Sequence, residues 1–268
     1  MNIGFIGCGN MARPIINAVL SEGVFAQNEI FVFDINTEML KAFCDDLKIT
    51  AALSAEEIIK GCDTVVLSVK PQVFATLLPT LKIDVEAHRP FLISIAAGKK
   101  ISQIAQFFDA PIAIARVFPN LNAQIKAAVS AYCVNEFASE EQLRQVKQIC
   151  ESFGSAYQLD EEQFPVFGVL GGCSPAYSFM YVNALAEAAH EAGLDKKLAL
   201  EVASRAVAGS AQLLPCVENT PLEMVNKVCS PGGTTIEGVI SLAACDFANI
   251  IKKAFNASLN KDKILSQS

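Results

Sequence analysis

Short apolar runs alternate with segments of helical periodicity up to Phe153. The runs predict strands, because an unbroken apolar run is typical of a strand buried on both faces of a parallel sheet. Repeated strand–helix pairs predict an α/β fold with a doubly wound Rossmann sheet. The predicted strands are Ile3–Ile6, Ile30–Phe33, Asp63–Val69, Phe91–Ile95, Ile112–Phe118 and Val129–Val134, and the helices include Met11–Ser21, Thr37–Leu47 with Thr37 as N-cap, and Ser139–Phe153.

The pattern changes beyond about residue 160, where only helical periodicity continues. Ser174 and Pro175 predict a helix start, with Ser at the N-cap and Pro at the first helical position, and Gly193 predicts its end. Further helices are predicted over Asp195–Leu214 and Pro221–Val228. The chain is therefore expected to divide into a Rossmann domain over residues 1–158 and an all-α domain over residues 159–268.

The predicted helix from Ser174 to Gly193 is apolar around much of its girth, and its polar residues Asn183, Glu187 and Glu191 form one narrow stripe. A helix of this kind is normally buried on most sides. A helical domain of about 100 residues has little surface of its own with which to bury it. We therefore expect the all-α domain to pack against a second copy of the chain in a homodimer.

Composition excludes several classes of partner. The net charge is −7 without a basic cluster, which argues against nucleic acid, and no apolar run reaches the roughly 18–20 residues of a membrane span. The nine cysteines form no C-x-x-C pair and only two histidines are present, so we expect free, buried thiols and no metal site. Because the first strand begins so early, without a preceding targeting segment, we expect a cytoplasmic protein.

The strongest chemical signal is Gly7-Cys8-Gly9-Asn10-Met11-Ala12, directly after the first predicted strand. This spacing matches the dinucleotide-binding motif G-x-G-x-x-A. Gly7 permits the tight turn, Gly9 lets the backbone approach a pyrophosphate, and Ala12 lets the helix pack close to the strand. The free N–H groups at the start of the helix would then face the phosphates of NADH or NADPH.

Asp34 ends the second predicted strand. A carboxylate at this position accepts hydrogen bonds from the adenosine ribose hydroxyls and repels a 2′-phosphate. No arginine lies near it in the sequence to receive such a phosphate, so NADH should be accepted at least as well as NADPH. The alternative is that Asp34 caps the turn through Asn36 and Thr37.

Three further loops follow predicted strands, and ligands of open α/β sheets bind outside the carboxyl ends of the strands. Val69-Lys70-Pro71 and Ala97-Gly98 are therefore expected near the cofactor, and Asn120 is expected to donate a hydrogen bond to a cofactor carboxamide or to a substrate. The alternatives are a solvated loop lysine at Lys70 and ordinary Pro-Asn turn chemistry at Asn120.

The segment Ser230-Pro231-Gly232-Gly233-Thr234-Thr235 is a second dense signal. It predicts a turn with exposed backbone N–H groups that opens a helix, which is a site for a small carboxylate. An ordinary capped turn needs only one Ser or Thr. Glu218, an isolated acid before this segment, either hydrogen-bonds a ring nitrogen or is simply solvated.

Taken together, these blocks resemble the pyrroline-5-carboxylate reductase family nearly from end to end. The resemblance is carried by Gly4–Ala12, Val69-Lys70-Pro71, Ala96-Ala97-Gly98, Arg116–Asn120, Gly172–Tyr177 and Ser230–Thr235. It implies a Rossmann domain, an intertwined α-helical dimerisation domain, dimers that assemble into decamers, and hydride transfer from NADPH or NADH to 1-pyrroline-5-carboxylate to give L-proline.

The resemblance also assigns residues. It implies that the turn with Ser230, Gly232, Gly233 and Thr234 holds the substrate carboxylate and that Thr235 hydrogen-bonds the substrate. Glu218 corresponds to an acidic residue near the substrate in the family. The sequence departs from the family between Leu121 and Ala128, where Lys126 and Ala128 replace glycines, and after Leu242, where Ala243 replaces an acid or amide.

Two other functions remain open from the sequence. One is a reductase of the same architecture that acts on a hydroxy acid or another imine, although Pro175–Gly193 lacks the lysine typical of hydroxy-acid dehydrogenases. The other is a nucleotide-binding protein with a regulatory role and no catalysis, which the altered Leu121–Ala128 segment favours.

Overall fold

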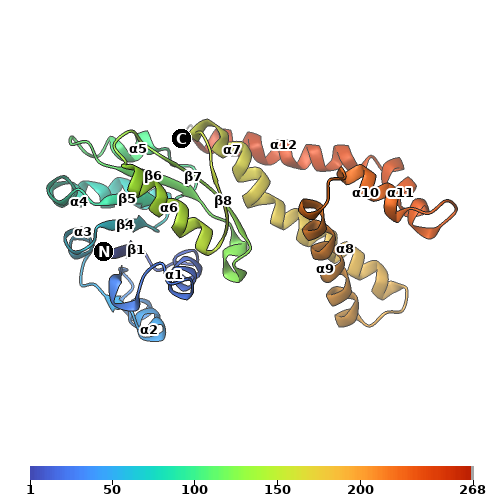
Figure 1. The fold of residues 1–268 in the computed structure, drawn as a ribbon, viewed down its shortest axis with the longest axis horizontal. Coiled ribbons are helices and arrows are strands. Elements are labelled where there is room, and N and C mark those ends of the chain that lie inside the picture. The colour runs from blue at the N-terminus through green and yellow to red at the C-terminus, as the bar shows by residue number, and fades with distance from the viewer. Residues whose placement is uncertain (267–268) are drawn as a thin grey trace. The chain divides into compact units, whose positions relative to one another are not determined.

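A computed structural model describes residues 1–266 and divides the chain into two compact units. Unit 1 holds Met1–Gly172 with residues 261–266 of the C-terminal helix, and unit 2 holds Cys173–Asn260 (Figure 1). The division follows contacts along the chain, and the functional boundary expected between residues 158 and 159 stays a prediction.

Unit 1 is built on an eight-stranded sheet with the order β3-β2-β1-β4-β5-β6-β7-β8. All neighbouring strands are parallel except β6 and β7. This arrangement confirms the predicted doubly wound sheet. The strands are β1 (Ile3–Ile6), β2 (Ile30–Phe33), β3 (Thr50–Ala51), β4 (Thr64–Leu67), β5 (Phe91–Ser94), β6 (Ile114–Phe118), β7 (Ala128–Val134) and β8 (Gly154–Gln158).

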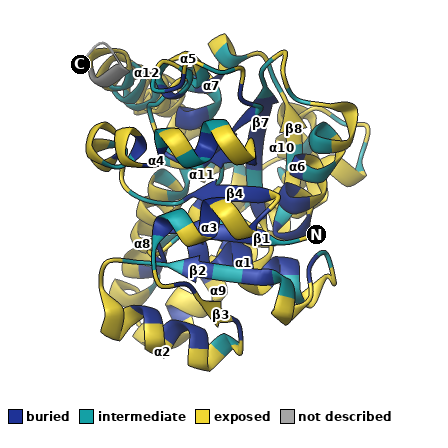
Figure 2. Cartoon of the chain, turned by 90° about the vertical axis from the view of Figure 1, so that its left-hand side faces the viewer, coloured by how far each residue is buried: buried dark blue, intermediate teal, exposed yellow. Residues whose placement is uncertain are grey.

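Successive side chains of each central strand enter two different apolar cores, because strand side chains alternate between the faces of a sheet. Ile3 and Phe5 of β1 pack with one set of helices, whereas Ile6 packs with the other. Buried residues line the strands between the helices (Figure 2). The first core contains α1 (Ala12–Ser21), α2 (Thr37–Leu47) and α6 (Glu140–Ser152), and the second contains α3 (Ala55–Gly61), α4 (Phe74–His88) and α5 (Ile101–Ala105).

Shorter helices complete unit 1. They are η1 (Gln27–Glu29), η2 (Pro71–Val73), η3 (Leu121–Ile125), η4 (Glu161–Gln163), α7 (Phe164–Phe167) and the π-helix η5 (Gly168–Cys173). In η5, Gly172 lies so close to the Phe118 ring that a Cβ would meet ring carbons at 2.8 Å. The small residues of this segment therefore let the wide turn pack against the end of β6.

Two predicted helix caps are wrong. The N-cap of α2 is Asn36, whose side chain accepts a hydrogen bond from Met39 N at 3.0 Å, while Thr37 is already helical. Ser174 is not an N-cap, because Cys173 before it already has helical dihedral angles at the end of η5. The predicted end of this helix is correct, since Gly193 follows it with φ +104°.

Unit 2 is helical throughout. Its helices are α8 (Ser174–Glu191), α9 (Lys196–Leu213), η6 (Leu214–Cys216), α10 (Pro221–Val228), α11 (Thr234–Ala244) and α12 (Phe247–Ser266). The buried residues between α8 and α9 are small, namely Ala186, Ala199 and Ala203, and the partly buried Val182 and Ala189 pack against them. The Tyr177 hydroxyl joins α8 to Ser258 Oγ of α12 at 2.5 Å.

Many large apolar side chains of unit 2 are exposed in the single chain. On α8 the exposed fractions reach 57% at Phe179 and 73% at Met180. On the later helices, Leu222 and Val228 are exposed by 77% and 65%. The apolar face of α8, which the sequence predicts to be buried, is therefore not covered within the single chain. This is expected if a second copy covers it.

Among the described residues, no single helix has the length and apolar character needed to cross a membrane, and α11 with α12 pass that test only as a pair bent by 50°. All nine cysteines are free. Five of them are buried as predicted, but Cys216 and Cys245 are exposed, which corrects the expectation of buried thiols at these positions.

Gly154 at the start of β8 lies against the backbone of β7 with no room for a side chain. Its φ is +151°, and a Cβ there would lie 2.1 Å from Ala128 O of β7. We therefore expect Gly154→Ala to destabilise the protein by about 2 kcal/mol or more through strain and overpacking. Denaturant unfolding at a fixed protein concentration measures this change.

The matched control is Gly61→Ala, because nothing lies within 4 Å of a Cβ at Gly61. This substitution should change stability by less than about 0.5 kcal/mol. Equal effects of the two substitutions would contradict the assigned contact.

Candidate cofactor and substrate sites

The turn after β1 is shaped by the close approach of two backbones. Gly7 has φ +105°, and a Cβ there would lie 2.9 Å from the Ser68 carbonyl carbon and oxygen after β4. Gly7 N donates to Phe33 O at 2.7 Å. At Gly9, by contrast, a Cβ would meet nothing within 4 Å, so the backbone there faces open space.

Helix α1 begins directly after this turn without a side-chain cap at Met11, and no acid lies in its first turn. Ala12 is 1% exposed and packs in the first core. An uncapped helix start leaves backbone N–H groups and a positive dipole end for an anion. Gly7, Gly9, Asn10, Met11 and Ala12 therefore form a turn that fits a dinucleotide pyrophosphate.

Ser68 fixes the turn from the neighbouring strand. Its Oγ lies 2.6 Å from Gly7 O and 3.1 Å from Ile6 O. Local sequence spacing assigns no role to Ser68. The sequence feature that could have identified Ser68 is a small hydroxyl residue at the end of a buried apolar strand, where it faces the backbone of the adjacent glycine turn.

Asp34 is held by two backbone amides. Cys8 N donates to its Oδ2 and Asn36 N donates to its Oδ1, both at 2.9 Å. The turn-capping alternative thus describes its contacts, and the remaining lone pairs of the carboxylate stay available for ribose hydroxyls. Burial, reinforced by the nearby Asp34 charge, raises the pKa of the Cys8 thiol to about 12, so Cys8 is protonated at neutral pH.

The loops after β4, β5 and β6 lie at the same edge of the sheet as the glycine turn. Lys70 is exposed and precedes Pro71, which opens η2, and Val69 is half-buried. Ala97 is exposed, and Gly98 turns the chain with φ +73°. These placements agree with a position near a cofactor, and their roles stay predictions.

Asn120 differs from its expected role as a donor to a ligand. It is 5% exposed, and its Nδ2 donates to Gly171 O of η5 at 2.9 Å. Its Oδ1 is buried and has no hydrogen-bond partner among the described residues. Asn120 therefore links the end of β6 to the π-helix, and its free polar atom is an acceptor.

Arg116 of the same block has a structural role. Its guanidinium lies 3.1 Å from Glu161 Oε1 and 4.5 Å from the centre of the Phe164 ring. These contacts join β6 to η4 and α7, so the arginine is not free to bind a ligand.

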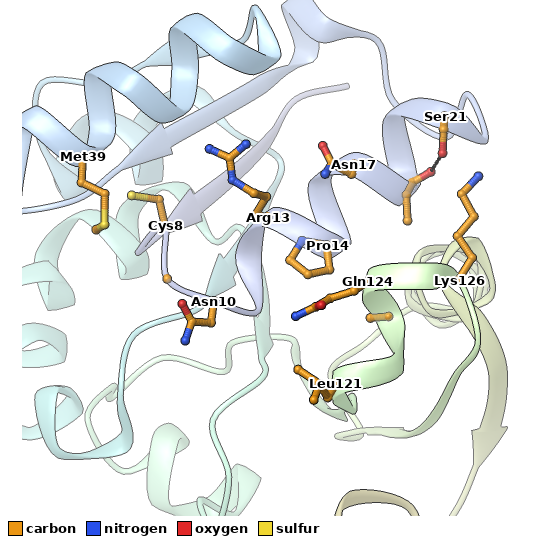
Figure 3. A pocket seen from close by; sticks show the side chains of 13 residues that line it. Cys8, Asn10, Arg13, Pro14, Asn17, Ser21, Met39, Leu121, Gln124 and Lys126 are labelled. Atoms are coloured by element: carbon orange, nitrogen blue, oxygen red, sulfur yellow. Dashed lines mark hydrogen bonds between the residues drawn. The ribbon is translucent and has the colours of Figure 1, made fainter. Parts of the chain in front are cut away.

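A cavity of about 850 Å³ extends from the glycine turn along α1 to η3 (Figure 3). Cys8, Asn10, Arg13, Leu121 and Gln124 line it. A second cavity of about 320 Å³ lies beside Asp34, Thr37 and Lys41. The first cavity borders the glycine turn, and the second borders Asp34, whose carboxylate accepts a hydrogen bond from the turn at Cys8 N.

The segment that departs from the family retains a glycine-like backbone. Lys126 has φ +56°, the left-handed region that glycine favours, and its Nζ pairs with Glu22 Oε1 at 2.5 Å. Ala123 of η3 is buried against the first core. The replacement at Lys126 therefore keeps the turn and adds an ion pair to the end of α1.

In unit 2, the Ser230–Thr235 segment forms the predicted turn and helix start. Gly232 has φ +68°, and Gly233 is the N-cap of α11 without a side-chain cap. Gly233 N donates to Ser230 O at 3.0 Å. Thr234 and Thr235 are exposed in the first turn, so hydroxyls and uncapped amides are presented together.

Glu218 lies between η6 and α10 and is exposed. Within the part of the chain that the structure describes, its carboxylate makes no hydrogen bond or ion pair. The structure therefore favours neither of its two alternative roles, which are hydrogen bonding to a ring nitrogen and simple solvation.

Comparisons with known proteins identify the family. Residues 161–265 match the family model for pyrroline-5-carboxylate reductase dimerisation, and residues 2–98 match that for coenzyme F420-dependent NADP oxidoreductases. The pyrroline-5-carboxylate reductase of Escherichia coli K12 is 33% identical over 267 residues, covering 99% of this chain and 98% of the relative. The chain belongs to the pyrroline-5-carboxylate reductase family.

Solved structures of family members agree with this assignment. The enzyme from Streptococcus pyogenes is 33% identical with a TM-score of 0.88, and 98% of each chain is covered. The enzyme from Coxiella burnetii is 29% identical with a TM-score of 0.92, covering 100% of this chain and 99% of that one. The family assignment suggested by the six sequence blocks is confirmed.

Ser68→Ala tests whether the glycine turn is held from β4. Losing the Ser68 hydroxyl frees the Gly7 carbonyl, and a hydrogen bond of this kind is worth about 0.5–1.5 kcal/mol. We therefore expect NADH to bind about 2- to 12-fold more weakly, measured by titrating the nicotinamide fluorescence.

Thr80→Ala is the control, because Thr80 makes a similar bond to Leu77 O within α4. It should leave the dissociation constant unchanged. Unaltered binding by Ser68→Ala would show that the turn keeps its shape without the hydroxyl.

Proposed function

We propose that this protein reduces 1-pyrroline-5-carboxylate to L-proline with NADPH or NADH. The observation that carries the proposal is the similarity to the pyrroline-5-carboxylate reductase of Escherichia coli, which is 33% identical along 99% of this chain. The uncapped α1 after a glycine turn and the uncapped α11 after a Pro-Gly-Gly turn support it, because both substrates are anions.

The cofactor site in this proposal lies at the carboxyl edge of the sheet in unit 1. The glycine turn and the start of α1 would hold the pyrophosphate, and Asp34 would accept hydrogen bonds from the adenosine ribose. Val69, Lys70, Pro71, Ala97 and Gly98 would line the cofactor from the following loops. Asn120, through its unpartnered Oδ1, would accept a hydrogen bond rather than donate one.

The substrate site in this proposal is the start of α11 in unit 2. The backbone amide of Thr234 and the Ser230 hydroxyl would hold the carboxylate, with Gly232 and Gly233 shaping the turn, since Gly233 N already donates to Ser230 O. Thr235 would hydrogen-bond the substrate and is proposed as a catalytic residue. Glu218 is proposed as a second catalytic residue, because its carboxylate would stabilise positive charge on the ring nitrogen.

The reduced nicotinamide supplies the hydride when bound, so the chemistry belongs to the cofactor and the protein provides position and charge. No side-chain acid is required if the substrate arrives as an iminium ion that already carries its proton. Thr235 and Glu218 therefore need only to orient the ring and stabilise its charge. This requirement agrees with a chain that has two histidines and no acid–base pair at either proposed site.

The dimerisation model over residues 161–265 and the exposed apolar side chains of unit 2 support a homo-oligomer. We infer that the basic unit is a homodimer, that dimers assemble into decamers, and that neither nucleic acid nor membrane is a partner. We further infer a cytoplasmic location from the free thiols, which are typical of a reducing compartment.

The decisive assay follows NAD(P)H absorbance with 1-pyrroline-5-carboxylate present. Oxidation of the cofactor with formation of L-proline supports the proposal. Cofactor binding without oxidation would instead favour a regulatory nucleotide-binding protein, and oxidation with a different imine alone would favour another substrate.

Thr235→Ala tests the substrate site. Losing a hydrogen bond to a charged group costs about 1.5–3 kcal/mol, so the KM for 1-pyrroline-5-carboxylate should rise from roughly tenfold to over a hundredfold. The dissociation constant of NADH should stay unchanged, since Thr235 belongs to unit 2. Steady-state kinetics and cofactor titration measure the two quantities.

Thr235→Ser is the matched control, because it keeps the hydroxyl and removes only a methyl group. It should restore most of the wild-type KM. Wild-type kinetics in Thr235→Ala would remove Thr235 from the site.

A further inference from the structure

The choice between NADH and NADPH depends on how charge is arranged where the adenosine ribose would lie. The two cofactors differ only in the 2′-phosphate, which needs a cation and is repelled by a fixed carboxylate. In this structure one such carboxylate is held in place by hydrogen bonds, and two nearby cations are already paired with acids.

Asp34 is an anchored charge. Its two oxygens accept hydrogen bonds from Cys8 N and Asn36 N, on the turns after β1 and β2 respectively. Rotation of the side chain away from a 2′-phosphate would break both bonds and leave the two amides without these acceptors. The carboxylate therefore keeps its place beside the ribose position.

Arg13 lines the same cavity as Cys8 and Met39 (Figure 3). Its Nη1 forms an ion pair with Asp46 Oδ2, and its guanidinium carbon lies 4.6 Å from the centre of the Phe43 ring. Both partners belong to α2, so the guanidinium is drawn toward that helix. Its charge is already balanced and its planar face is already stacked.

Lys41 beside the second cavity is occupied in the same way. Its Nζ lies 3.3 Å from Asp45 Oδ2, one turn further along α2. Asp45 and Asp46 occupy the last turn of α2, where the helix dipole disfavours acids. Asp46 and Asp45 thus neutralise Arg13 and Lys41, which line the first and the second cavity respectively.

We propose that this chain selects NADH over NADPH, because Asp34 repels a 2′-phosphate and Asp46 holds Arg13 away from it. The proposal rests on the function proposed above and adds two residues that determine cofactor specificity. Asp34 acts directly on the ribose, whereas Asp46 is a positioning residue that acts through Arg13.

Direct binding tests the preference in the wild-type protein. Nicotinamide fluorescence gives the dissociation constants of NADH and NADPH without substrate, and we expect NADH to bind about tenfold more tightly or better. The difference should shrink as the salt concentration rises, because Asp34 is only half-buried and its charge is partly screened by ions.

Asp46→Asn removes one charge and keeps the shape of the side chain. We expect NADPH to bind about 3- to 10-fold more tightly as Arg13 is released, with the affinity for NADH unchanged. Arg13→Gln combined with Asp46→Asn should abolish this gain. Asp34→Ser should shift the ratio of the two affinities toward NADPH more strongly, by removing the repulsion itself.

Glu151→Gln is the matched control, because it removes the acid of an exposed ion pair with Lys147 on α6. It should leave the ratio unchanged. A gain for NADPH in this variant, or a gain that persists without Arg13, would mean that total charge rather than Arg13 sets the preference and would overturn the role of Asp46.

The outcomes separate the two proposals. Equal or tighter binding of NADPH by the wild-type protein, together with reduction of 1-pyrroline-5-carboxylate, would overturn the selectivity and leave the proposed function intact. Binding of neither cofactor would overturn both.

Discussion

The close approach of the Gly7 backbone to the end of β4 is the constraint on which the cofactor end of this protein depends. Because a Cβ at Gly7 would lie 2.9 Å from the Ser68 carbonyl group, only glycine fits there. The same turn is hydrogen-bonded in three directions, because Gly7 N donates to Phe33 O, Cys8 N donates to Asp34 Oδ2, and Ser68 Oγ donates to Gly7 O. The turn thereby holds the start of α1 in place, and no capping side chain covers the free backbone N–H groups there.

Unit 2 depends on a different constraint, which is the lack of apolar surface within one chain to cover its helices. Alanines form the buried contact between α8 and α9, while Phe179, Met180 and other large side chains remain exposed. Small residues allow two helices to lie close together, and the large ones are left for contact with another copy. The match of residues 161–265 to the family's dimerisation model agrees with association through this unit.

The fold was predictable where one physical signal dominates. Buried parallel strands such as β1 and β2 have continuous apolar runs, and their predicted bounds match the structure. The strands that were missed lack that signal, since β3 has two residues and β8 is Gly-Ser-Ala-Tyr-Gln with little burial. The cap at Ser174 was mispredicted because a π-helix directly precedes it. No simple sequence pattern marks the hydrogen bonding of a π-helix.

The site was predictable only as far as glycine turns and strand ends mark it. Local spacing located Gly7, Gly9 and the Ser230–Thr235 segment. It did not reveal that Asn120 uses its donor on Gly171 O or that Ser68 supports the glycine turn, because each contact joins segments far apart in the sequence. The ion pair between Arg13 and Asp46 is equally hidden, since the two residues lie on different helices.

Under the proposed selectivity, Asp34 and Asp46 would influence cofactor choice at different structural cost. Asp34 would carry the charge that faces the ribose, and it accepts hydrogen bonds from two backbone amides, so its replacement would disturb the glycine turn along with the specificity. Asp46 lies at the exposed end of α2 and would act only through Arg13, so its replacement would leave the turn unaltered. Specificity would thus be adjustable at α2 while the glycine turn keeps its geometry. If Asp46→Asn alone changes the cofactor preference, the repulsion between Asp34 and a 2′-phosphate must be weak enough for the Arg13 guanidinium, once freed from Asp46, to offset it.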